Sequence, residues 1–182
     1  SLFTTKNGLK IIKKLNLLQN IRVEGPTNHL KKRETPTMGG IFMIIPFLIF
    51  LLIITINLGS SKLFLLFLTI LGFFITGFLD DYLSIKKKEN TGLRTKEKFA
   101  FQSIISITFI FLAYKKNLID PFISVSDSWG ININIFIVPI SFLVLVGISN
   151  SVNLTDGLDG LAAGCSGIVF YGLGTEILMK DQ

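Results

Sequence analysis

The sequence has 182 residues, of which 49% are hydrophobic and 16% are charged, whereas a soluble domain carries about 25% charged residues. The formal net charge is +6, and in so apolar a chain this indicates a membrane surface and anionic substrates rather than nucleic acid. The single cysteine and the single histidine, Cys165 and His29, exclude an internal disulfide, a cysteine zinc site and a histidine-rich metal site. An integral membrane protein is the class that remains.

Residues 1–40 are basic and contain neither a long apolar run nor a recognisable signal peptide. Within them, Lys6–Asn20 is amphipathic, which predicts a helix lying on the membrane surface or, equally, a cytoplasmic extension of a preceding span. Gly39 and Gly40 close the segment, and their backbone amides at a helix start could receive an anion. Residue 1 is Ser, so we expect the natural start of the protein to lie upstream.

Five long uncharged stretches follow, each close to the roughly 20 apolar residues that a membrane-spanning helix needs. We predict spans over residues 41–58, 63–80, 99–115, 131–149 and 160–178. The fold class is therefore all-α, a polytopic helical bundle in the membrane, with residues 1–182 forming one membrane-embedded domain. Buried helices of a soluble protein are the alternative, but five in succession would leave too little polar surface to cover them.

The distribution of basic residues predicts the orientation of these spans. Of the 18 Lys and Arg residues, eight lie in residues 1–40 and six in residues 86–98. The two segments share one side of the membrane if each span crosses once. The positive-inside rule then places residues 1–40, 80–98 and about 150–160 in the cytoplasm, where all the unusual polar residues of the chain would meet.

Two adjacent carboxylates, Asp80 and Asp81, stand at the cytoplasmic end of the second predicted span. Beside an apolar helix they are costly unless they meet cations, and Mg2+ is typically held by one or two carboxylates together with substrate phosphates. The pair predicts a magnesium–phosphate site, while a solvated helix end with Lys86–Lys88 as partners explains it equally well. The basic run over residues 86–98 is able to neutralise a pyrophosphate or, instead, to contact anionic lipid.

The segment N-S-V-N-L-T-D-G-L-D-G, residues 150–160, contains no Lys or Arg. Its amides and carboxylates recur every three residues, at Asn150, Asn153, Asp156 and Asp159. On a helix they would share one side, but the glycines favour a loop in the middle of the segment. Polar groups without local counter-ions predict an external partner such as a metal, ribose hydroxyls or a base edge. A polar turn between spans is the alternative.

Together, these motifs resemble the phospho-N-acetylmuramoyl-pentapeptide transferase family. The resemblance rests on H-L-K-K from His29 with T-P-T-M-G-G at residues 35–40, on D-D-Y at residues 80–82, and on N-S-V-N-L-T-D-G-L-D-G-L-A at residues 150–162. That family has ten spans and is roughly twice as long, so we expect a chain truncated at both ends. The later loops of the family, with another metal-binding Asp and a histidine cluster, are absent, and Ser84 stands where the family usually has Lys.

The resemblance implies a magnesium-dependent enzyme in the bacterial inner (plasma) membrane, with its active site on the cytoplasmic side. It would transfer phospho-N-acetylmuramoyl-pentapeptide from its UDP-activated form to undecaprenyl phosphate, giving lipid I and UMP. Asp80 and Asp81 would be catalytic, with Asp81 near the Mg2+. The substrate-binding residues would be Lys32, Thr37, Lys88, Lys96, Asn150, Asn153, Asp156 and Asp159. Membrane lipids and a second copy of the chain are further expected partners, and nucleic acid is not.

The acceptor phosphate has a second pKa of about 6, so it is largely dianionic at neutral pH and needs no strong general base. Mg2+ and lysines would offset its repulsion from the pyrophosphate. Direct attack by the lipid phosphate is favoured, although a covalent aspartyl intermediate stays open. We expect this chain alone to be inactive, because the later loops of the family are missing.

Two other functions are compatible with parts of the pattern. One is a sister enzyme that transfers N-acetylglucosamine-1-phosphate to the same lipid. The other is a membrane transporter, since intramembrane carboxylates also serve transport. The carboxylates here gather at one face of the membrane rather than in the middle of a span, which argues against transport.

Overall fold

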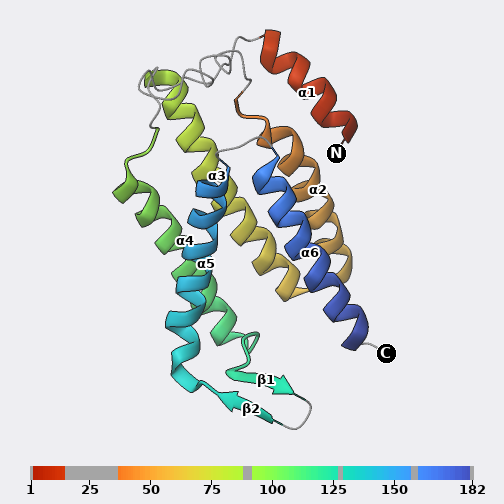
Figure 1. Ribbon diagram of the computed structural model, residues 1–182, viewed down its shortest axis with the longest axis vertical. Helices are drawn as coiled ribbons and strands as arrows, with labels where there is room; N and C mark the ends of the chain where they lie inside the picture. The colour runs from red at the N-terminus through yellow and green to blue at the C-terminus, as the bar shows by residue number, and fades with distance from the viewer. Residues whose placement is uncertain (1, 15–36, 88–91, 127–128, 157–159, 181–182) are drawn as a thin grey trace. The chain divides into compact units, whose positions relative to one another are not determined.

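The computed structural model describes residues 2–14, 37–87, 92–126, 129–156 and 160–180. Within these ranges, five helices are long and apolar enough to cross a membrane (Figure 1). They are α2 (Gly40–Leu58), α3 (Ser61–Lys87), α4 (Thr95–Lys115), α5 (Ile137–Thr155) and α6 (Leu161–Lys180). The predicted all-α fold with about five spanning helices is confirmed.

The chain divides into two compact units, residues 1–132 and 133–182. The first unit contains α1 (Leu2–Lys14), α2, α3, α4 and an antiparallel hairpin of β1 (Phe122–Ser126) and β2 (Trp129–Asn132). In this unit α3 packs against both α2 and α4, and α1 packs against α2. The second unit contains the short 3-10 helix η2 (Asn134–Phe136), α5 and α6, and α5 packs against both of the others.

A glycine turn makes α2 and α3 antiparallel neighbours. Gly59 ends α2 in the left-handed conformation, with φ 58°, and its N–H donates to the carbonyl of Ile56 over 3.3 Å. Glycine adopts this conformation without the steric cost that a Cβ would impose. Ser60 Oγ then accepts the N–H of Leu63 at the start of α3, over 3.4 Å.

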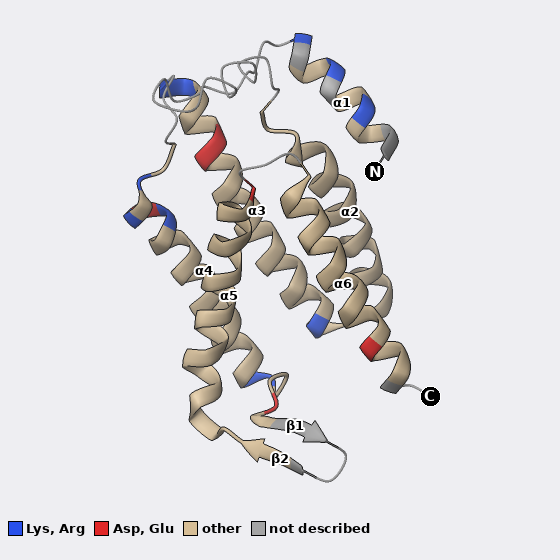
Figure 2. Cartoon of the chain, in the orientation of Figure 1, with Lys and Arg blue, Asp and Glu red and all other residues tan. Residues whose placement is uncertain are grey.

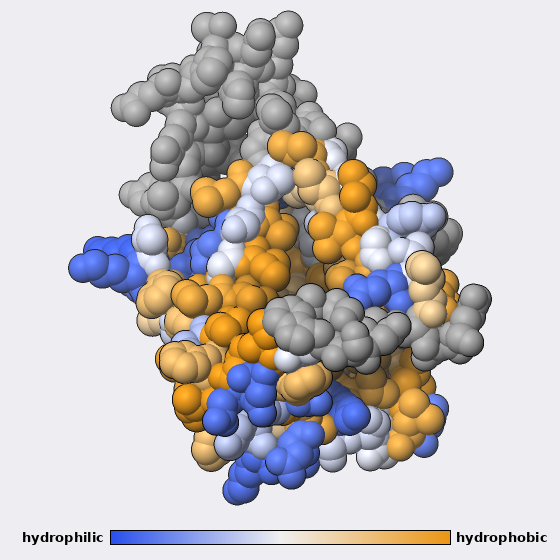
Figure 3. Space-filling view, turned by 60° about the horizontal axis from the view of Figure 1, so that its bottom comes forward, coloured by the Kyte–Doolittle hydropathy of each residue, from blue (hydrophilic) through white to orange (hydrophobic). Residues whose placement is uncertain are grey.

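Large apolar side chains stand open on the surface of the spanning helices (Figure 3). On α2, for example, Phe47, Phe50 and Ile53 are all exposed. A helix that is apolar all round belongs in a membrane or in the core of a larger protein. The exposed apolar surface therefore supports the membrane assignment.

The contact between α3 and α4 is built from small and polar residues. The fully or nearly buried residues of α4 recur every three or four positions, at Gln102, Ser106, Ile110 and Ala113. On α3, Thr76 Oγ1 donates to the carbonyl of Gly72 over 3.0 Å. A Cβ on Gly72 would lie 3.1 Å from Ile105 of α4. Small residues let helix backbones approach closely in membranes, and polar side chains turn away from lipid.

Helix α1 packs with one face on the first turns of α2 (Figure 1). Thr4 Oγ1 donates to the carbonyl of Phe42 over 3.1 Å. One turn on, Gly8 lies so close to the Phe42 ring that a Cβ would overlap it, and Ile12 follows with 2% exposure. The exposed lysines of α1 lie on the opposite face, at Lys6, Lys10 and Lys14. Residues 15–20 of the predicted helix lie outside the described residues.

Two helices extend beyond the predicted bounds. Helix α3 continues beyond the span predicted over residues 63–80, through Asp81 to Lys87, and Lys86 and Lys87 in its last turn interact favourably with the carboxyl end of the helix dipole. The loop expected in the middle of residues 150–160 is helical up to Thr155. There the polar side chains bond within the helix: Asn150 Nδ2 donates to the carbonyl of Val146 over 2.8 Å.

The hairpin of β1 and β2 was not predicted. The span expected over residues 131–149 begins in strand β2, and its helical part starts with η2 at Asn134. Phe122 pairs with Asn132, and Ile123 with Ile131. Alternation of β-branched or aromatic residues with small polar ones suits a pleated strand, but the run of apolar residues that follows masked this short pattern.

Charged residues gather at the two ends of the spanning helices in the first unit (Figure 2). Lys86 and Lys87 end α3, and Arg94, Lys96 and Lys98 lie at the start of α4. The opposite helix ends carry Lys62, Lys115 and Lys116. The predicted orientation, with the first group in the cytoplasm, stays a prediction.

This orientation is open to a labelling experiment on residues 1–182 in bacterial spheroplasts. Single cysteines at Lys86 or Lys115 are introduced after the exposed native Cys165 is changed to Ser. We expect a membrane-impermeant maleimide to label Lys115→Cys in intact spheroplasts, and Lys86→Cys only after lysis, because positive residues are retained in the cytoplasm. Labelling of Lys86→Cys alone in intact spheroplasts would reverse the topology.

Candidate active site

Asp80 joins α3 to the start of α4. Its Oδ1 atom accepts the N–H of Leu93 over 2.9 Å, and its Oδ2 atom accepts the ammonium group of Lys98 over 2.7 Å. The side chains of Asp80 and Lys98 are 24% and 20% exposed. A hydrogen-bonded ion pair at this distance and burial is stronger than an exposed one. Both carboxylate oxygens of Asp80 are therefore used in contacts that hold α3 to the start of α4.

The connection between α3 and α4 is held at further points. Lys87 Nζ donates to the carbonyl of Gly92 over 2.7 Å. Gly92 is buried, and a Cβ there would overlap the carbonyl oxygen of Asp80. Glu97 accepts the N–H of Arg94 over 2.8 Å, which caps the first turn of α4. Backbone and side chains thus give residues 92–98 a defined course against α3.

Asp81 differs from its neighbour. It follows Asp80 on α3, so its side chain lies about 100° further round the helix, and it is exposed. Within the described ranges, no hydrogen bond or ion pair of Asp81 is found. An ionised carboxylate at the end of an apolar helix, next to a second one, is stabilised by a cation. Asp81 is the member of the pair that is open to a ligand.

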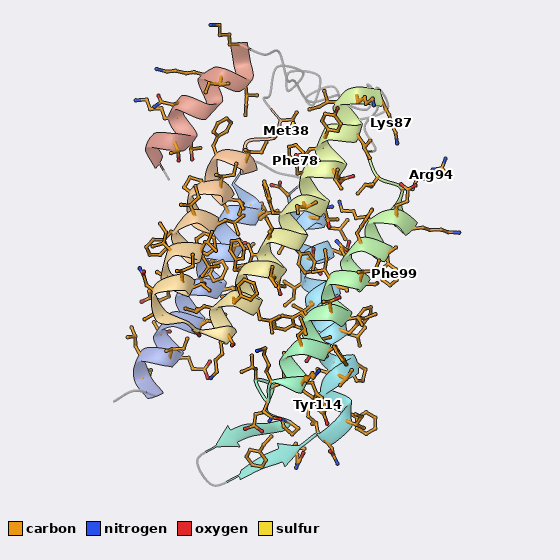
Figure 4. All side chains as sticks on the ribbon, turned by 180° about the vertical axis from the view of Figure 1, so that it is seen from behind. Met38, Phe78, Lys87, Arg94, Phe99 and Tyr114 are labelled. Atoms are coloured by element: carbon orange, nitrogen blue, oxygen red, sulfur yellow. The ribbon has the colours of Figure 1, made fainter. Side chains whose placement is uncertain are left out.

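Exposed cations surround this end of the first unit. Lys87 and Arg94 mark the last turn of α3 and the start of α4 in Figure 4. Both are exposed, as is Lys96 in the first turn of α4. Exposed lysine and arginine side chains at the same end of the first unit as an open carboxylate suit a metal-bound phosphate.

The second unit carries the other predicted polar segment. Asn150 and Asn153 stand one turn apart on α5, and Asp156 follows as the cap at its carboxyl end. Asn153 and Asp156 are exposed, and Asn150 is half-buried. Asp156 donates its own N–H to the carbonyl of Val152 over 3.2 Å, which leaves its side chain outside the helix ladder. These groups are able to bond a polar ligand.

Several predicted site residues are not part of the contacts described above. Lys32, Lys88 and Asp159 lie outside the described residues. Thr37 is half-buried and opens the described range that leads into α2. The structure brings Asp80 against Gly92, Leu93 and Lys98, and Lys96 lies on the same first turn of α4 as Lys98.

The sequence interpretation missed Lys98 as a partner of Asp80, and Gly92 as a close-packed position. Lys98 was one cation among six in residues 86–98, and nothing in its spacing distinguished it. Its contact with Asp80 crosses 18 positions of the chain and depends on how α4 packs against α3. The one available signal was a glycine followed directly by an apolar residue in an otherwise polar connection.

The donor set fits part of a magnesium site. No group of three or more His, Cys, Asp or Glu residues forms in the part of the chain that the structure describes. Protein sites for Mg2+ need only one or two carboxylates when substrate phosphates supply further oxygens. Asp81, which is exposed and makes no described hydrogen bond or ion pair, meets that requirement, with Asp80 beside it.

The sequence matches a known protein family. Residues 63–181 match the model of the family described as Glycosyl transferase family 4. The chain belongs to this family, whose match covers α3 to α6, including the Asp80–Asp81 pair and residues 150–160.

Two individual relatives show this similarity in more detail. Over its whole length the chain is 84% identical to a protein of Prochlorococcus marinus strain MIT 9312, named phospho-N-acetylmuramoyl-pentapeptide-transferase, of which it covers 51%. It is 44% identical over 173 residues to a Staphylococcus saprophyticus protein with the same name. The matched region covers 89% of this chain and 52% of that protein. The resemblance drawn from the three motifs is confirmed. The chain spans about half the length of the curated relatives it matches.

Proposed function

We propose that this chain contributes half of a phospho-N-acetylmuramoyl-pentapeptide transferase. An oxygen of undecaprenyl phosphate would attack the sugar-linked phosphorus of UDP-N-acetylmuramoyl-pentapeptide. A new P–O bond forms, the bond to UMP breaks, and the products are lipid I and UMP. The observation that carries the proposal is an open carboxylate, Asp81, beside exposed cations at the end of two membrane helices, in a chain 84% identical to a relative of that name.

Asp81 is proposed as the residue that would hold Mg2+, because it is exposed and makes no described hydrogen bond or ion pair. When bound, Mg2+ would draw negative charge from the pyrophosphate and from the leaving UMP. Lys96 and Arg94, exposed at the start of α4, would bind phosphate oxygens. Lys32, Thr37 and Lys88 are also proposed to bind phosphate oxygens of the substrates.

Asp80 is proposed to orient the site rather than to take a proton. Both of its oxygens already accept hydrogen bonds, from Leu93 N–H and from Lys98. Both oxygens are thus engaged in contacts that hold α3 to α4. The acceptor phosphate, with a second pKa of about 6, is largely dianionic at neutral pH and attacks without a base. This supports direct transfer over a covalent aspartyl intermediate.

The second unit is proposed to recognise the nucleotide. Asn150, Asn153, Asp156 and Asp159 offer amide and carboxylate groups, with no Lys or Arg among residues 150–160. Such groups suit ribose hydroxyls and the edge of a uracil base. The site would face the cytoplasm, where the UDP-linked substrate is dissolved, and the acceptor phosphate would reach it from the headgroup layer of the inner membrane.

The test is a chimera in which this chain replaces the matching half of the MIT 9312 relative. With undecaprenyl phosphate and Mg2+, the purified chimera should release UMP from UDP-N-acetylmuramoyl-pentapeptide, measured by chromatography. Residues 1–182 alone should release none, because the chain spans about half the length of the relatives that carry the name of this transferase. Release from UDP-N-acetylglucosamine instead would identify the sister enzyme, and release from neither substrate would contradict the proposed function.

A further inference from the structure

Lys98 differs from the other cations at the start of α4. Arg94 and Lys96 are exposed, whereas the side chain of Lys98 is 20% exposed and its ammonium group lies on Asp80 Oδ2. Lys98 is in the first turn of α4, and Asp80 is more than a turn before the end of α3. The ion pair therefore joins two spanning helices at the end where the substrates would arrive.

Three further contacts converge on the same point. Leu93 N–H donates to the other oxygen of Asp80, Gly92 lies against the carbonyl of Asp80, and Lys87 Nζ donates to the carbonyl of Gly92. Lys98 is the only side-chain cation among the described residues that contacts the Asp80 carboxylate. Without it, a half-buried carboxylate would keep one backbone N–H as its partner, which is costly.

We propose that Lys98 is a positioning residue for the transfer reaction, which holds Asp80 against the connection between α3 and α4 and so keeps Lys96 in place relative to Asp81. The inference rests on the proposed function. Asp81 is rigidly linked to Asp80 along α3, and Lys96 is two residues from Lys98 on α4. A change in the Asp80–Lys98 distance therefore moves the two groups that would bind the metal and the phosphate. Misplacement by about 1 Å is enough to slow a reaction roughly 100-fold.

The test is a double-mutant cycle in the chimera, with UMP release as the readout. Lys98→Met should lower kcat roughly 10- to 100-fold, with a smaller change in the KM for the UDP-linked substrate. If Lys98 acts through Asp80, the two effects should not add. The double variant with Asp80→Asn and Lys98→Met should then release UMP no more slowly than the slower of the two single variants. Lys98→Arg keeps the ion pair and should retain most of the activity.

A second readout does not depend on turnover. Hydrogen–deuterium exchange of the peptide that contains Leu93 should become faster in Lys98→Met, because the Asp80 carboxylate is no longer held toward that N–H. Lys115→Met is the matched control, since it removes an exposed lysine from the far end of α4. It should change neither the rate nor the exchange.

Each outcome decides something. An inactive wild-type chimera contradicts the proposed function, and the exchange measurement still tests the contact. With an active wild type, unchanged turnover in Lys98→Met overturns the inference. Multiplying effects in the double variant also overturn it, because they show that Lys98 acts independently of Asp80. If Lys98→Met fails to fold, Lys98→Arg decides, since equal loss in that variant contradicts a role through the ion pair.

Discussion

Asp81→Asn should lower UMP release by the chimera by roughly 10²- to 10³-fold, the cost of losing one well-placed electrostatic group in an active site. The substitution keeps the size of the side chain and removes its charge. Because Asp81 is exposed and makes no described hydrogen bond or ion pair, its replacement by Asn should leave the fold unchanged. The effect should therefore fall on catalysis and on the Mg2+ concentration that gives half-maximal rate, both measured by UMP release.

Asp120→Asn is the matched control for this charge. Asp120 is exposed near the hairpin, and its Oδ1 atom accepts the N–H of Phe122 over 2.9 Å, which an amide oxygen can also do. Its turnover and melting temperature should equal those of the unmodified chimera. If Asp81→Asn stays within about tenfold of the unmodified rate, Asp81 is not the metal-binding carboxylate proposed here, since a group of that kind is worth more.

Gly92→Ala should both destabilise the protein and reduce its activity. A Cβ at this position would overlap the backbone carbonyl of Asp80, and backbone, unlike a flexible side chain, cannot turn aside. Overpacking of this kind costs roughly 1–3 kcal/mol. Because the displaced segment carries Lys96 and Lys98, UMP release should fall roughly 100-fold. Thermal unfolding in detergent and the UMP assay measure the two effects separately.

Gly77→Ala provides the comparison, because Gly77 lies on α3, the helix that carries Asp80, and a Cβ there meets nothing within 4 Å. Alanine favours a helix by about 1 kcal/mol over glycine, so this variant should be at least as stable as the unmodified protein. An equal melting temperature in Gly92→Ala and the unmodified chimera would show that the connection does not pack closely against Asp80.

The sequence was sufficient for those features that depend on neighbouring residues. Each spanning helix follows from a continuous apolar run, so four of the five predicted spans begin within a few positions of the helices found. The predicted carboxylate pair lies at the same end of the first unit as the basic connection, because both flank one helix end. The ends of the helices were less certain, since the run from Leu83 to Lys87 continues α3 although it is no longer purely apolar.

Features that depend on packing between helices were out of reach of the sequence. Asp80 and Asp81 are identical in type and adjacent, yet one is held by Leu93 and Lys98 and the other is exposed. The two side chains differ by a rotation of about 100° around α3. Which of them contacts α4 depends on where α4 packs, and the sequence alone does not give that position. Gly92 is a second example. A glycine in a polar connection indicates a turn, but its close approach to the Asp80 carbonyl follows only from the packing of the connection against α3.

The polar stripe of α4 has a consequence for biogenesis. Of the five spanning helices described, α4 is the least apolar, and Gln102 and Ser106 face α3 rather than lipid. A segment of this kind leaves the translocation channel less readily on its own than α2 does, because polar residues near the middle of a helix oppose partition into lipid. Since α3 emerges from the ribosome just before it and offers the matching surface at Gly72 and Thr76, the two helices are suited to enter the bilayer together as a pair.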